Sequence, residues 1–526
     1  MRTLRSYVCG RWHEAASGFA PLYDPSTEEE IGRASSAGVD FGSALVHARE
    51  LGGPALRALT FPQRGELLRA MGKALREHRD ELLELSRRNT GTTKPDGSFD
   101  VDGASGTFAY YAGLARQLGE RTFLVEGDGV MLARSDAFWG QHVLVPRQGV
   151  AVHVNAFNFP AWGFAEKAAC ALLAGMPVLT KPATATALVA ARCVEIVLEK
   201  GLLPEGGLQL VVGGTGDLLD RLGPQDVLAF TGSLETALAL RRRPHLHAVS
   251  TRFNVEADSL NAAVLAPDVP DSGPTFDLFV RDVAREMTQK SGQKCTAVRR
   301  ILVPAERMKA VQEALVARLG QVVTGNPAYP AATMGPLATA AQLDSALAGV
   351  TELRQAARLV HGTGHRTDGA GSPPGKGWFL APTLLRAEDA AGAGPVHRRE
   401  VFAPVATLLP YSGAAPDAGE IVALGGGTLV TSAYSDDPAW LAQFAGAVGP
   451  VTGRLYVGSE GSAAEAPGSG IALPQTLHGG PGRAGGGEEL GGLVGVKLYM
   501  QRLALQGSRA TVERLAGLGA DTGQKT

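Results

Sequence analysis

Between residues 149 and 242, short apolar segments alternate with longer helical ones, and this alternation constrains the fold more than any other feature. The pattern predicts strands over 150–154, 177–180, 208–212 and 227–230, and helices over 161–174, 184–200 and 233–242. Strands that alternate with helices of this length form βαβ units in a parallel sheet. We therefore expect an α/β fold, with a nucleotide bound at the carboxyl ends of the strands.

The alternation resumes further along the chain. Strands are expected over 262–265 and 301–303, and helices over 276–290 and 307–319. Ahead of the first unit, the pattern predicts one helix over 61–89, a break over 90–98, a helix over 108–118 and a hairpin over 125–145. The Gly/Pro-rich stretch 362–377 is expected to be a surface loop, and a second Gly-rich stretch, 459–493, precedes an apolar segment, 493–503.

Composition argues against several functional classes. The 526 residues indicate two to four domains, and an apolar content of 44% allows a large core. The net charge of −2 gives no support for nucleic-acid or membrane-surface binding, and the longest apolar run, 168–174, is too short to span a bilayer. The four cysteines are scattered without a CxxC pair, which argues against zinc or iron–sulfur sites. Unpaired cysteines and the lack of an N-terminal signal core fit a cytoplasmic protein.

Cys295 is the strongest candidate for chemistry. It follows the predicted helix 276–290 and the helix-stopping pair Ser291-Gly292, and it precedes a short strand. A cysteine in such a turn can be reached by a substrate, and a thiolate is the strongest nucleophile among the side chains at neutral pH. Taken alone, a cysteine is more often a small buried residue of the core, and the rest of the sequence has to outweigh that alternative.

Three polar residues follow predicted parallel strands. Asn158 comes after the first strand and could stabilise an oxyanion through its amide, although an asparagine in a turn is an equal alternative. Lys181 ends the second strand and could bind ribose or phosphate, although an isolated lysine is usually solvated. Ser233 opens a helix, where its hydroxyl and free backbone N–H groups could bind an anion.

Two glutamates complete the set of candidates. Glu256 lies just after a predicted strand, in a loop, and could act as a general base for water. Glu400 could accept hydrogen bonds from ribose hydroxyls. Either residue could instead be a solvated surface carboxylate.

Taken together, these motifs resemble the aldehyde dehydrogenase superfamily in kind, order and spacing over nearly the whole chain. The motifs are Asn-Phe-Pro (158–160), Lys-Pro (181–182), Phe-Thr-Gly-Ser (230–233), Glu256, Gly-Gln-Lys-Cys (292–295) and Glu-Val-Phe-Ala-Pro (400–404). Longer phrases around Asn158, Lys181 and Cys295, and His-Gly-Gly-Pro-Gly-Arg at 478–483, are similar to the PaaZ-type dehydrogenase domain of bacterial phenylacetate degradation. The chain departs from the superfamily where Ala257-Asp258 replaces a Gly-containing loop after the glutamate, and where Phe157 replaces a common tryptophan.

The resemblance implies a role for each residue. Cys295 would attack the aldehyde, Asn158 and the Cys295 N–H would hold the oxyanion, and Glu256 would activate the hydrolytic water. The residues implied to bind the cofactor are Phe157, Lys181, Thr184, Gly232, Ser233, Glu400 and Phe402. Relatives that prefer NAD often carry a glutamate three residues after the lysine, where it repels a 2′-phosphate. Here that residue is Thr184, so we expect NADP, with NAD possible.

The resemblance also implies the architecture. The expected parts are a Rossmann-like cofactor domain (1–124 and 148–258), an α/β catalytic domain (259–475) and a β-hairpin oligomerisation flap (125–147 and 476–526) that forms a homodimer. The implied substrate is a CoA-linked semialdehyde of aromatic acid degradation, 3,4-dehydroadipyl-CoA semialdehyde. The alternatives are a CoA-acylating or other semialdehyde dehydrogenase and a non-catalytic relative that retains the fold.

Overall fold

The computed structural model describes residues 1–518, and its first large sheet confirms the predicted α/β class. Seven strands lie in the order β12-β11-β8-β9-β10-β2-β3. All neighbours from β12 to β10 are parallel, whereas β2 and β3 pair antiparallel at the edge. In that spatial order the strands are Arg252–Glu256, Val227–Thr231, Ala151–Val154, Val178–Lys181, Leu208–Leu210, Ser6–Val8 and Arg11–His13.

The strand order places a topological switch point beside β8. From β8 the chain proceeds through β9 to β10 on one side, and then returns to β11 and β12 on the other. Ligands of open α/β sheets bind outside the carboxyl ends of the strands at such a point. The first residues past these ends include Asn155, while Thr231 and Lys181 end β11 and β9.

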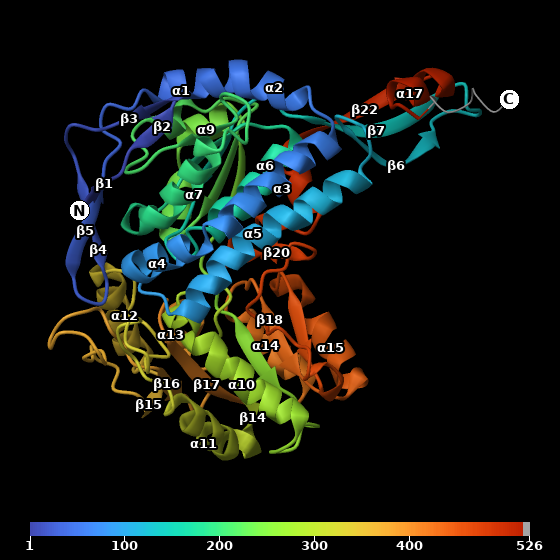
Figure 1. Ribbon diagram of the computed structural model, residues 1–526. Helices are drawn as coiled ribbons and strands as arrows, with labels where there is room; N and C mark the ends of the chain where they lie inside the picture. The colour runs from blue at the N-terminus through green and yellow to red at the C-terminus, as the bar shows by residue number, and fades with distance from the viewer. Residues whose placement is uncertain (519–526) are drawn as a thin grey trace.

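Helices cover both faces of this sheet, because successive side chains of its strands point into two different cores. Ala151 and Val178 pack into one core with α3, α5, α6 and α7, and their neighbours Val152 and Leu179 pack into another with α1 and α8. Figure 1 shows α3 and α5 lying side by side across the first of these faces. The six helices are Phe41–His47 (α1), Phe61–Glu77 (α3), Lys94–Gln117 (α5), Trp162–Ala174 (α6), Ala187–Glu199 (α7) and Leu234–Arg241 (α8).

A second seven-stranded sheet forms the lower half of the molecule in Figure 1. Its order is β15-β16-β17-β14-β13-β18-β19, with only β15 antiparallel to its neighbour. The strands are Arg358–His361, Thr383–Arg386, Val405–Tyr411, Arg300–Pro304, Ala262–Leu265, Thr431–Tyr434 and Leu455–Gly458. One face packs on α10 (Pro274–Thr288) and α11 (Met308–Leu319), and the other on α12 (Ala340–Leu353), α14 (Ala415–Ala423) and α15 (Pro438–Val448).

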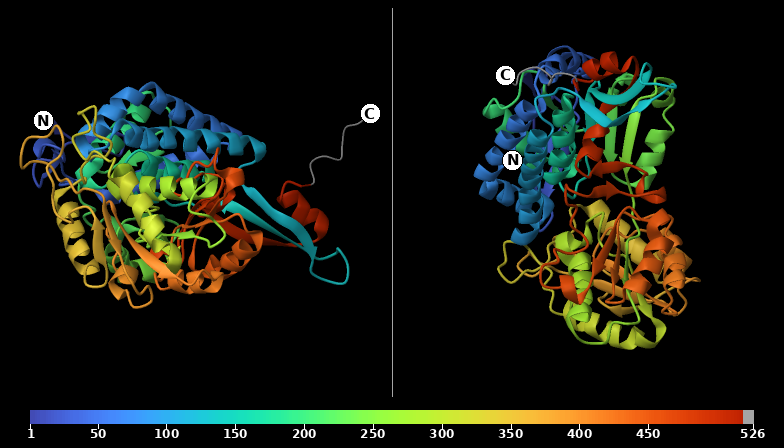
Figure 2. Two further views of the ribbon diagram at one scale, coloured as in Figure 1. Left: turned by 90° about the horizontal axis from the view of Figure 1, so that it is seen from below. Right: turned by 90° about the vertical axis from the view of Figure 1, so that its right-hand side faces the viewer.

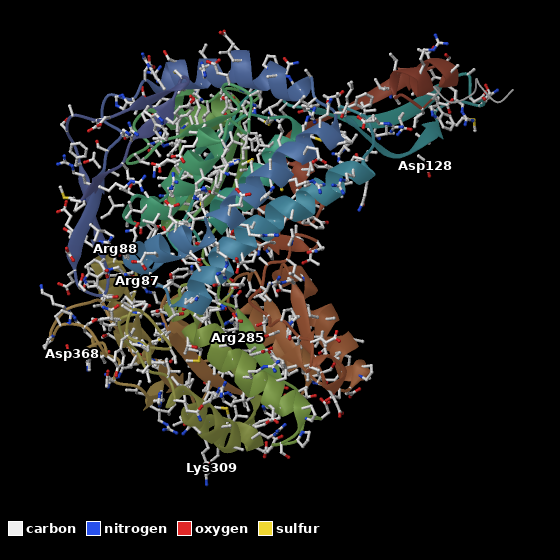
Figure 3. The ribbon with its side chains drawn as sticks, viewed as in Figure 1. Arg87, Arg88, Asp128, Arg285, Lys309 and Asp368 are labelled. Carbon is white, nitrogen blue, oxygen red and sulfur yellow. The ribbon has the colours of Figure 1, made fainter. Side chains whose placement is uncertain are left out.

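A three-stranded arm projects from the body, as Figure 1 and the left view of Figure 2 show. Its strands are Leu124–Met131 (β6), Trp139–Pro146 (β7) and Met500–Gly507 (β22), with β7 in the centre, and α17 (Arg509–Leu515) packs against it. The β6–β7 pair confirms the predicted hairpin. Asp128 lies on this arm, far from Arg285 and Lys309 of the second half (Figure 3), and Asp368 is exposed in the predicted surface loop.

The structure corrects several predicted boundaries. The single helix expected over 61–89 is two, α3 and α4 (Arg79–Thr90). The break expected over 90–98 is shorter, because α5 begins at Lys94, where the Thr93 side chain accepts a hydrogen bond from the Asp96 N–H. Pro95 fits this first turn, where no N–H partner is required.

The predicted division into domains stays a prediction. The large sheets draw on the ranges expected for the cofactor and catalytic parts, and β22 joins the hairpin of the expected flap. The expected flap also includes β20 (Leu477–Gly479) and β21 (Glu488–Leu490), but β21 contacts α6 and β12 within the body. The end of the flap, 519–526, lies outside the described residues. Among residues 1–518, no helix combines the length and apolar character that crossing a bilayer requires.

Candidate active site

A tight turn after α10 presents Cys295. Lys290, Ser291 and Gly292 all have a positive φ, which reverses the chain between the helix and β14. At Gly292 the φ is 67°, and a Cβ atom would lie 2.3 Å from the carbonyl oxygen of Ala403, so only glycine fits there. The Asn261 side chain then donates to the Cys295 carbonyl at 2.7 Å. These contacts fix the backbone that carries the cysteine.

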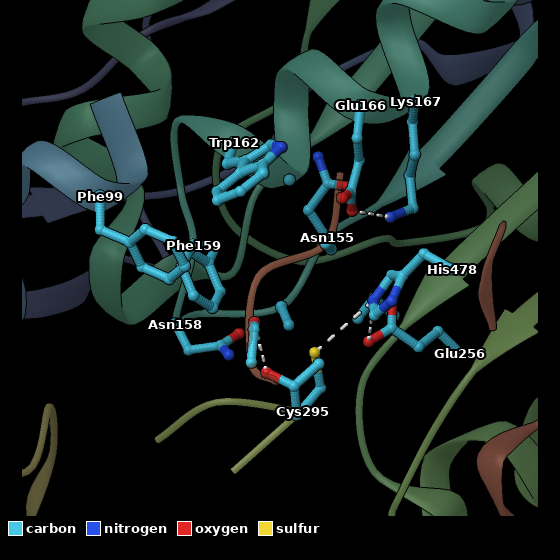
Figure 4. A pocket seen from close by; sticks show the side chains of 16 residues that line it. Phe99, Asn155, Asn158, Phe159, Trp162, Glu166, Lys167, Glu256, Cys295 and His478 are labelled. Atoms are coloured by element: carbon cyan, nitrogen blue, oxygen red, sulfur yellow. Dashed lines mark hydrogen bonds and ion pairs between the residues drawn. The ribbon is translucent and has the colours of Figure 1, made fainter. Parts of the chain in front are cut away.

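Cys295, Asn158 and Glu256 line one cavity of about 40 Å³, which Figure 4 shows from close by. Asn158 comes from the loop after β8, and its amide donates to the Gln293 carbonyl oxygen at 2.9 Å. Apolar and polar side chains share the wall. Besides the three candidates, the lining residues are Phe99, Asn155, Ala156, Phe159, Trp162, Gly163, Glu166, Lys167, Thr231, Thr296, Gly470, Ala472 and His478.

Glu256 is neither in a loop nor solvated, which corrects both of those expectations. It is the last residue of β12, and only 3% of its surface is exposed. Strand pairing with β11 leaves its side chain at the sheet edge beside the cavity. Burial alone would raise the pKa of Glu256, but His478 and Lys167 hold it below its ordinary value.

His478 lies between the cysteine and the glutamate. Its Nε2 atom is 3.7 Å from Cys295 Sγ and 3.3 Å from Glu256 Oε1. Burial lowers the pKa of the imidazole, yet the Glu256 carboxylate outweighs that effect and raises it. Burial and Glu256 raise the pKa of the Cys295 thiol, so the resting cysteine carries its proton. His478 has no role among the residues predicted from the sequence.

A buried charge cluster adjoins this group. Lys167 Nζ lies 2.8 Å from Glu166 Oε1 and 3.2 Å from Glu489 Oε2, and Asn254 donates to the other oxygen of Glu489 at 3.1 Å. Burial raises the pKa of Glu489 to about 7. This cluster was not predicted either, although Glu166 and Lys167, two charged residues within the otherwise apolar helix 161–174, indicate it in the sequence.

The residues predicted to bind a cofactor lie outside the cavity lining. Lys181 and Gly232 lie at the carboxyl ends of β9 and β11, whereas Glu400 and Phe402 come just before β17. Lys181 is buried, its Nζ donates to the Pro182 carbonyl at 3.1 Å, and burial lowers its pKa to about 8. The Thr184 hydroxyl donates to the Gly213 carbonyl at 3.1 Å. Phe157 and Phe402 meet edge to face, with ring centroids 5.8 Å apart.

The start of α8 differs from its prediction. The Ser233 side chain caps the helix by accepting from the Thr236 N–H, and Gly232 donates its N–H to the Glu256 carbonyl. The carboxylate of Asp258 accepts from the Leu234 N–H at 2.8 Å. The Leu234 and Thr236 N–H groups are therefore not free, because the Asp258 carboxylate occupies the first and the Ser233 hydroxyl occupies the second.

Glu400 is held by protein groups. One carboxylate oxygen accepts from the Ser259 N–H at 3.1 Å, and the other lies 3.4 Å from Arg299 Nε. Burial raises the pKa of Glu400 to about 7, although Arg299 opposes the shift. The surface-carboxylate alternative is therefore wrong for this residue.

Comparisons with known proteins agree with this geometry. The model of the aldehyde dehydrogenase family matches residues 12–472. The chain is 45% identical, over 91% of its length and 93% of the relative's, to the 3,4-dehydroadipyl-CoA semialdehyde dehydrogenase of Aromatoleum evansii. It is 28% identical to the hydroxyisobutyraldehyde dehydrogenase of Mycolicibacterium austroafricanum, over 77% of both chains.

Solved structures share the fold. Lactaldehyde dehydrogenase from Escherichia coli superposes with a TM-score of 0.84 at 22% identity, covering 96% of this chain and 99% of that one. Betaine aldehyde dehydrogenase from Staphylococcus aureus, solved with NAD+, gives a TM-score of 0.84 at 22% identity, covering 96% of this chain and 95% of that one.

Proposed function

This chain belongs to the aldehyde dehydrogenase family, and from that premise we propose that it oxidises 3,4-dehydroadipyl-CoA semialdehyde to the free carboxylic acid with NADP. The substrate assignment is carried by the 45% identity to the Aromatoleum evansii enzyme over 91% of this chain. The reaction type is supported by the grouping of Cys295, Asn158 and Glu256 around one cavity. A product with a free carboxylate requires a base for water, and a buried Glu256 beside that cavity supports this role.

Cys295 begins the reaction. Its Sγ atom forms a bond to the carbonyl carbon of the aldehyde, while the thiol proton passes to the adjoining His478–Glu256 pair. The carbonyl electrons move onto oxygen, where the Cys295 N–H and the Asn158 amide can donate to the developing charge. A bound NADP+ would supply the acceptor for the hydride of this carbon, and Cys295 would then carry the acyl group as a thioester.

Glu256 serves the second half-reaction. Its carboxylate takes a proton from water as the water oxygen attacks the thioester carbon. The carbon–sulfur bond breaks, the acid leaves, and the sulfur regains a proton. His478 and Lys167 lower the pKa of Glu256, so the carboxylate is ionised at neutral pH and has a lone pair for the proton of water.

The residues present fit an adenine dinucleotide. The Lys181 ammonium has three N–H groups and donates to one carbonyl, so it retains donors for ribose or phosphate oxygens. It lies at the carboxyl end of β9, next to the switch point. Thr184 carries no carboxylate and therefore does not repel the 2′-phosphate of NADP.

Substrate assignment is tested by initial rates. We expect kcat/KM for a CoA-linked semialdehyde to exceed that for succinic semialdehyde and acetaldehyde by at least about tenfold, with NADPH and free acid as products. Cys295→Ala should abolish turnover of all three. Equal rates on the small aldehydes would contradict the substrate assignment and leave the enzyme class intact. Formation of a new CoA thioester would instead favour an acylating dehydrogenase.

The NADP assignment is tested by Thr184→Glu. A carboxylate at this position should lower kcat/KM for NADP+ by at least about tenfold and leave that for NAD+ within a few-fold, since only the 2′-phosphate is repelled. Thr184→Gln, of the same length without the charge, is the matched control. A parallel fall for both cofactors would show that residue 184 does not discriminate between them.

The arm supports a homodimer. Val130, Met131, Leu132, Phe138 and Leu503 expose between 43% and 55% of their surface on or beside its strands. Apolar side chains gathered on a projecting element are typical of an interface between proteins.

The four unpaired cysteines support a reducing compartment, the cytoplasm, as the site of action.

A further inference from the structure

Cys295, His478 and Glu256 bring three different metal-binding atoms together. The thiol sulfur, an imidazole nitrogen and a carboxylate oxygen all lie within 4.8 Å of one another. They come from the turn after α10, from β20 and from the end of β12, so no short sequence motif contains them. Sulfur, imidazole and carboxylate are the ligands that zinc uses in proteins, and three such ligands with one open position are typical of an accessible zinc site.

The distances fit a tetrahedral ion. Bond lengths of about 2.3 Å to sulfur and about 2.0–2.1 Å to nitrogen and oxygen separate S from N by roughly 3.6 Å and N from O by roughly 3.4 Å. The observed separations are 3.7 Å from Cys295 Sγ to His478 Nε2 and 3.3 Å from His478 Nε2 to Glu256 Oε1. Two of the three edges of the ligand triangle therefore need almost no movement.

A second observation points to a cation at the same place. Glu256 Oε1 is buried and, among the described residues, accepts no hydrogen bond of acceptable geometry, although His478 Nε2 lies 3.3 Å from it. A buried carboxylate oxygen that accepts no well-aligned hydrogen bond is costly and is normally satisfied. A divalent ion bound to this oxygen, to the Cys295 thiolate and to a neutral His478 would make a group of zero net charge, which suits a buried site.

The neighbouring acidic group is a poorer metal site. Glu166, Glu256 and Glu489 also approach within 4.8 Å of one another. Lys167 already pairs with Glu166 and Glu489, so an ammonium occupies that space. These two ion pairs reduce the repulsion that Lys167 exerts on a cation bound to Glu256.

We propose that Cys295, His478 and Glu256 form a binding site for a thiophilic divalent cation, zinc above all, which reversibly masks the nucleophile. On binding, the Cys295 thiol loses its proton to solvent and its sulfur bonds to the ion, with water in the fourth position. The cavity of about 40 Å³ has room for the ion and that water. The masked sulfur cannot attack an aldehyde and is shielded from alkylation and oxidation.

The test uses the full-length, reduced and chelator-treated protein titrated with zinc, and with cobalt as a spectroscopic substitute. We expect one equivalent of zinc to bind, with a sulfur-to-metal charge-transfer band and tetrahedral d–d bands in the cobalt protein. Cys295→Ser should remove the charge-transfer band. His478→Gln and Glu256→Gln should each weaken zinc binding by at least about tenfold, because each removes a ligand.

Cys9→Ser is the matched control, because Cys9 is the other partly exposed cysteine, and this variant should bind zinc normally. Zinc should slow the labelling of Cys295 by iodoacetamide but not that of Cys9. Absence of stoichiometric binding, a cobalt spectrum without sulfur ligation, or undiminished affinity in His478→Gln would overturn the proposal. X-ray absorption of the wild-type zinc protein decides the ligand set even if a variant folds poorly, with one sulfur and an imidazole expected.

Different results would contradict the zinc site and the proposed reaction on which it rests. Zinc should inhibit turnover, and a chelator should restore it, whereas the metal-free enzyme should be fully active. Active enzyme that zinc does not bind would overturn only the metal site. Metal-free enzyme without aldehyde oxidation would overturn only the proposed function.

Discussion

Lys167 lies between two carboxylates in the interior, and its charge determines whether they can remain buried there. Only 2% of the Lys167 surface is exposed, and Glu166 and Glu489 contact its ammonium at 2.8 and 3.2 Å. The attraction within such a group roughly offsets the cost of removing the charges from water. Removal of one member leaves the others buried without compensation.

We predict that Lys167→Met destabilises the protein by about 3–5 kcal/mol, because it leaves the buried Glu489 carboxylate and the partly buried Glu166 carboxylate without their cation. Denaturant unfolding of the variant measures this loss. The double variant Lys167→Met/Glu489→Gln should recover part of it, since one of the stranded charges is gone. An unchanged free energy of unfolding in the single variant would show that the cluster is better solvated than its burial indicates.

Lys181 should give NADP turnover a pH dependence. Burial lowers the pKa of its ammonium to about 8, so the group is charged below that pH and neutral above it. We predict that kcat/KM for NADP+ falls as the pH rises through about 8, because the neutral amine no longer attracts a phosphate. The profile with NAD+ should be flatter, and Lys181→Met should remove the difference. Identical profiles for both cofactors in the wild-type enzyme would rule out a phosphate contact by Lys181.

At the residue scale, the sequence was informative where polar residues follow strands. Cys295, Asn158 and Glu256 were predicted to act together, and they line one cavity. His478 and Glu489 were missed because they lie in a Gly-rich stretch without periodicity, where only the fold determines what a side chain contacts. The groups that Asp258 and Glu400 contact depend on long-range packing, which no local pattern reveals.

The turn between α10 and β14 is the element on which the position of Cys295 most depends. Three successive residues of positive φ reverse the chain, and the backbone of Ala403 passes against Gly292. The Arg299 guanidinium donates to the Gly292 and Ala403 carbonyls, both at 2.9 Å, and holds the two segments together.

We predict that Gly292→Ala lowers kcat about 100-fold, because the new methyl group must displace the Ala403 backbone and with it Cys295. Gly119→Ala is the matched control. Gly119 has a similar φ of 71°, but its Cβ would meet no atom within 4 Å. The Gly119→Ala variant should therefore lose only about 1–2 kcal/mol of stability, because alanine is disfavoured in the left-handed conformation, and it should keep its kcat. Equal activity of the two variants would contradict this account of the turn.

At the element scale, periodic segments were predicted well and their ends were not. Most predicted strands and helices of the two sheets exist within a few residues of their expected positions. β12 was not recognised as a strand over its length, since Arg252 and Asn254 interrupt its apolar pattern. The hydrogen bond accepted by the Thr93 side chain determines where α5 begins. In the sequence, a proline or glycine close to such a cap looks like the end of a helix, although it lies in the first turn of one.

At the scale of the whole molecule, the cavity draws on both large sheets. β12 and the loop after β8 supply Glu256 and Asn158, while the turn before β14 supplies Cys295. The proposed active site is therefore complete only when both parts are folded and packed together. The arm lies away from this junction in Figure 1, so its role can be tested separately from catalysis.

We predict that Leu503→Glu makes the protein monomeric, because it places a charge on the apolar arm, where Leu503 is 47% exposed. Light scattering coupled to size-exclusion chromatography measures the mass. Leu424→Glu is the matched control, since Leu424 is 48% exposed but lies at the end of α14. A wild-type protein that is already monomeric at micromolar concentration would refute the dimer.

The most direct test of the account is to trap the acyl group on the cysteine. Glu256→Gln, mixed with NADP+ and a CoA-linked semialdehyde, should release one equivalent of NADPH in a burst and then stall, because water is no longer activated. Peptide mass spectrometry of the stalled enzyme should place the acyl group on Cys295. A variant that turns over at the wild-type rate, or a burst without an adduct on Cys295, would contradict covalent catalysis by Cys295 with Glu256 as the hydrolytic base.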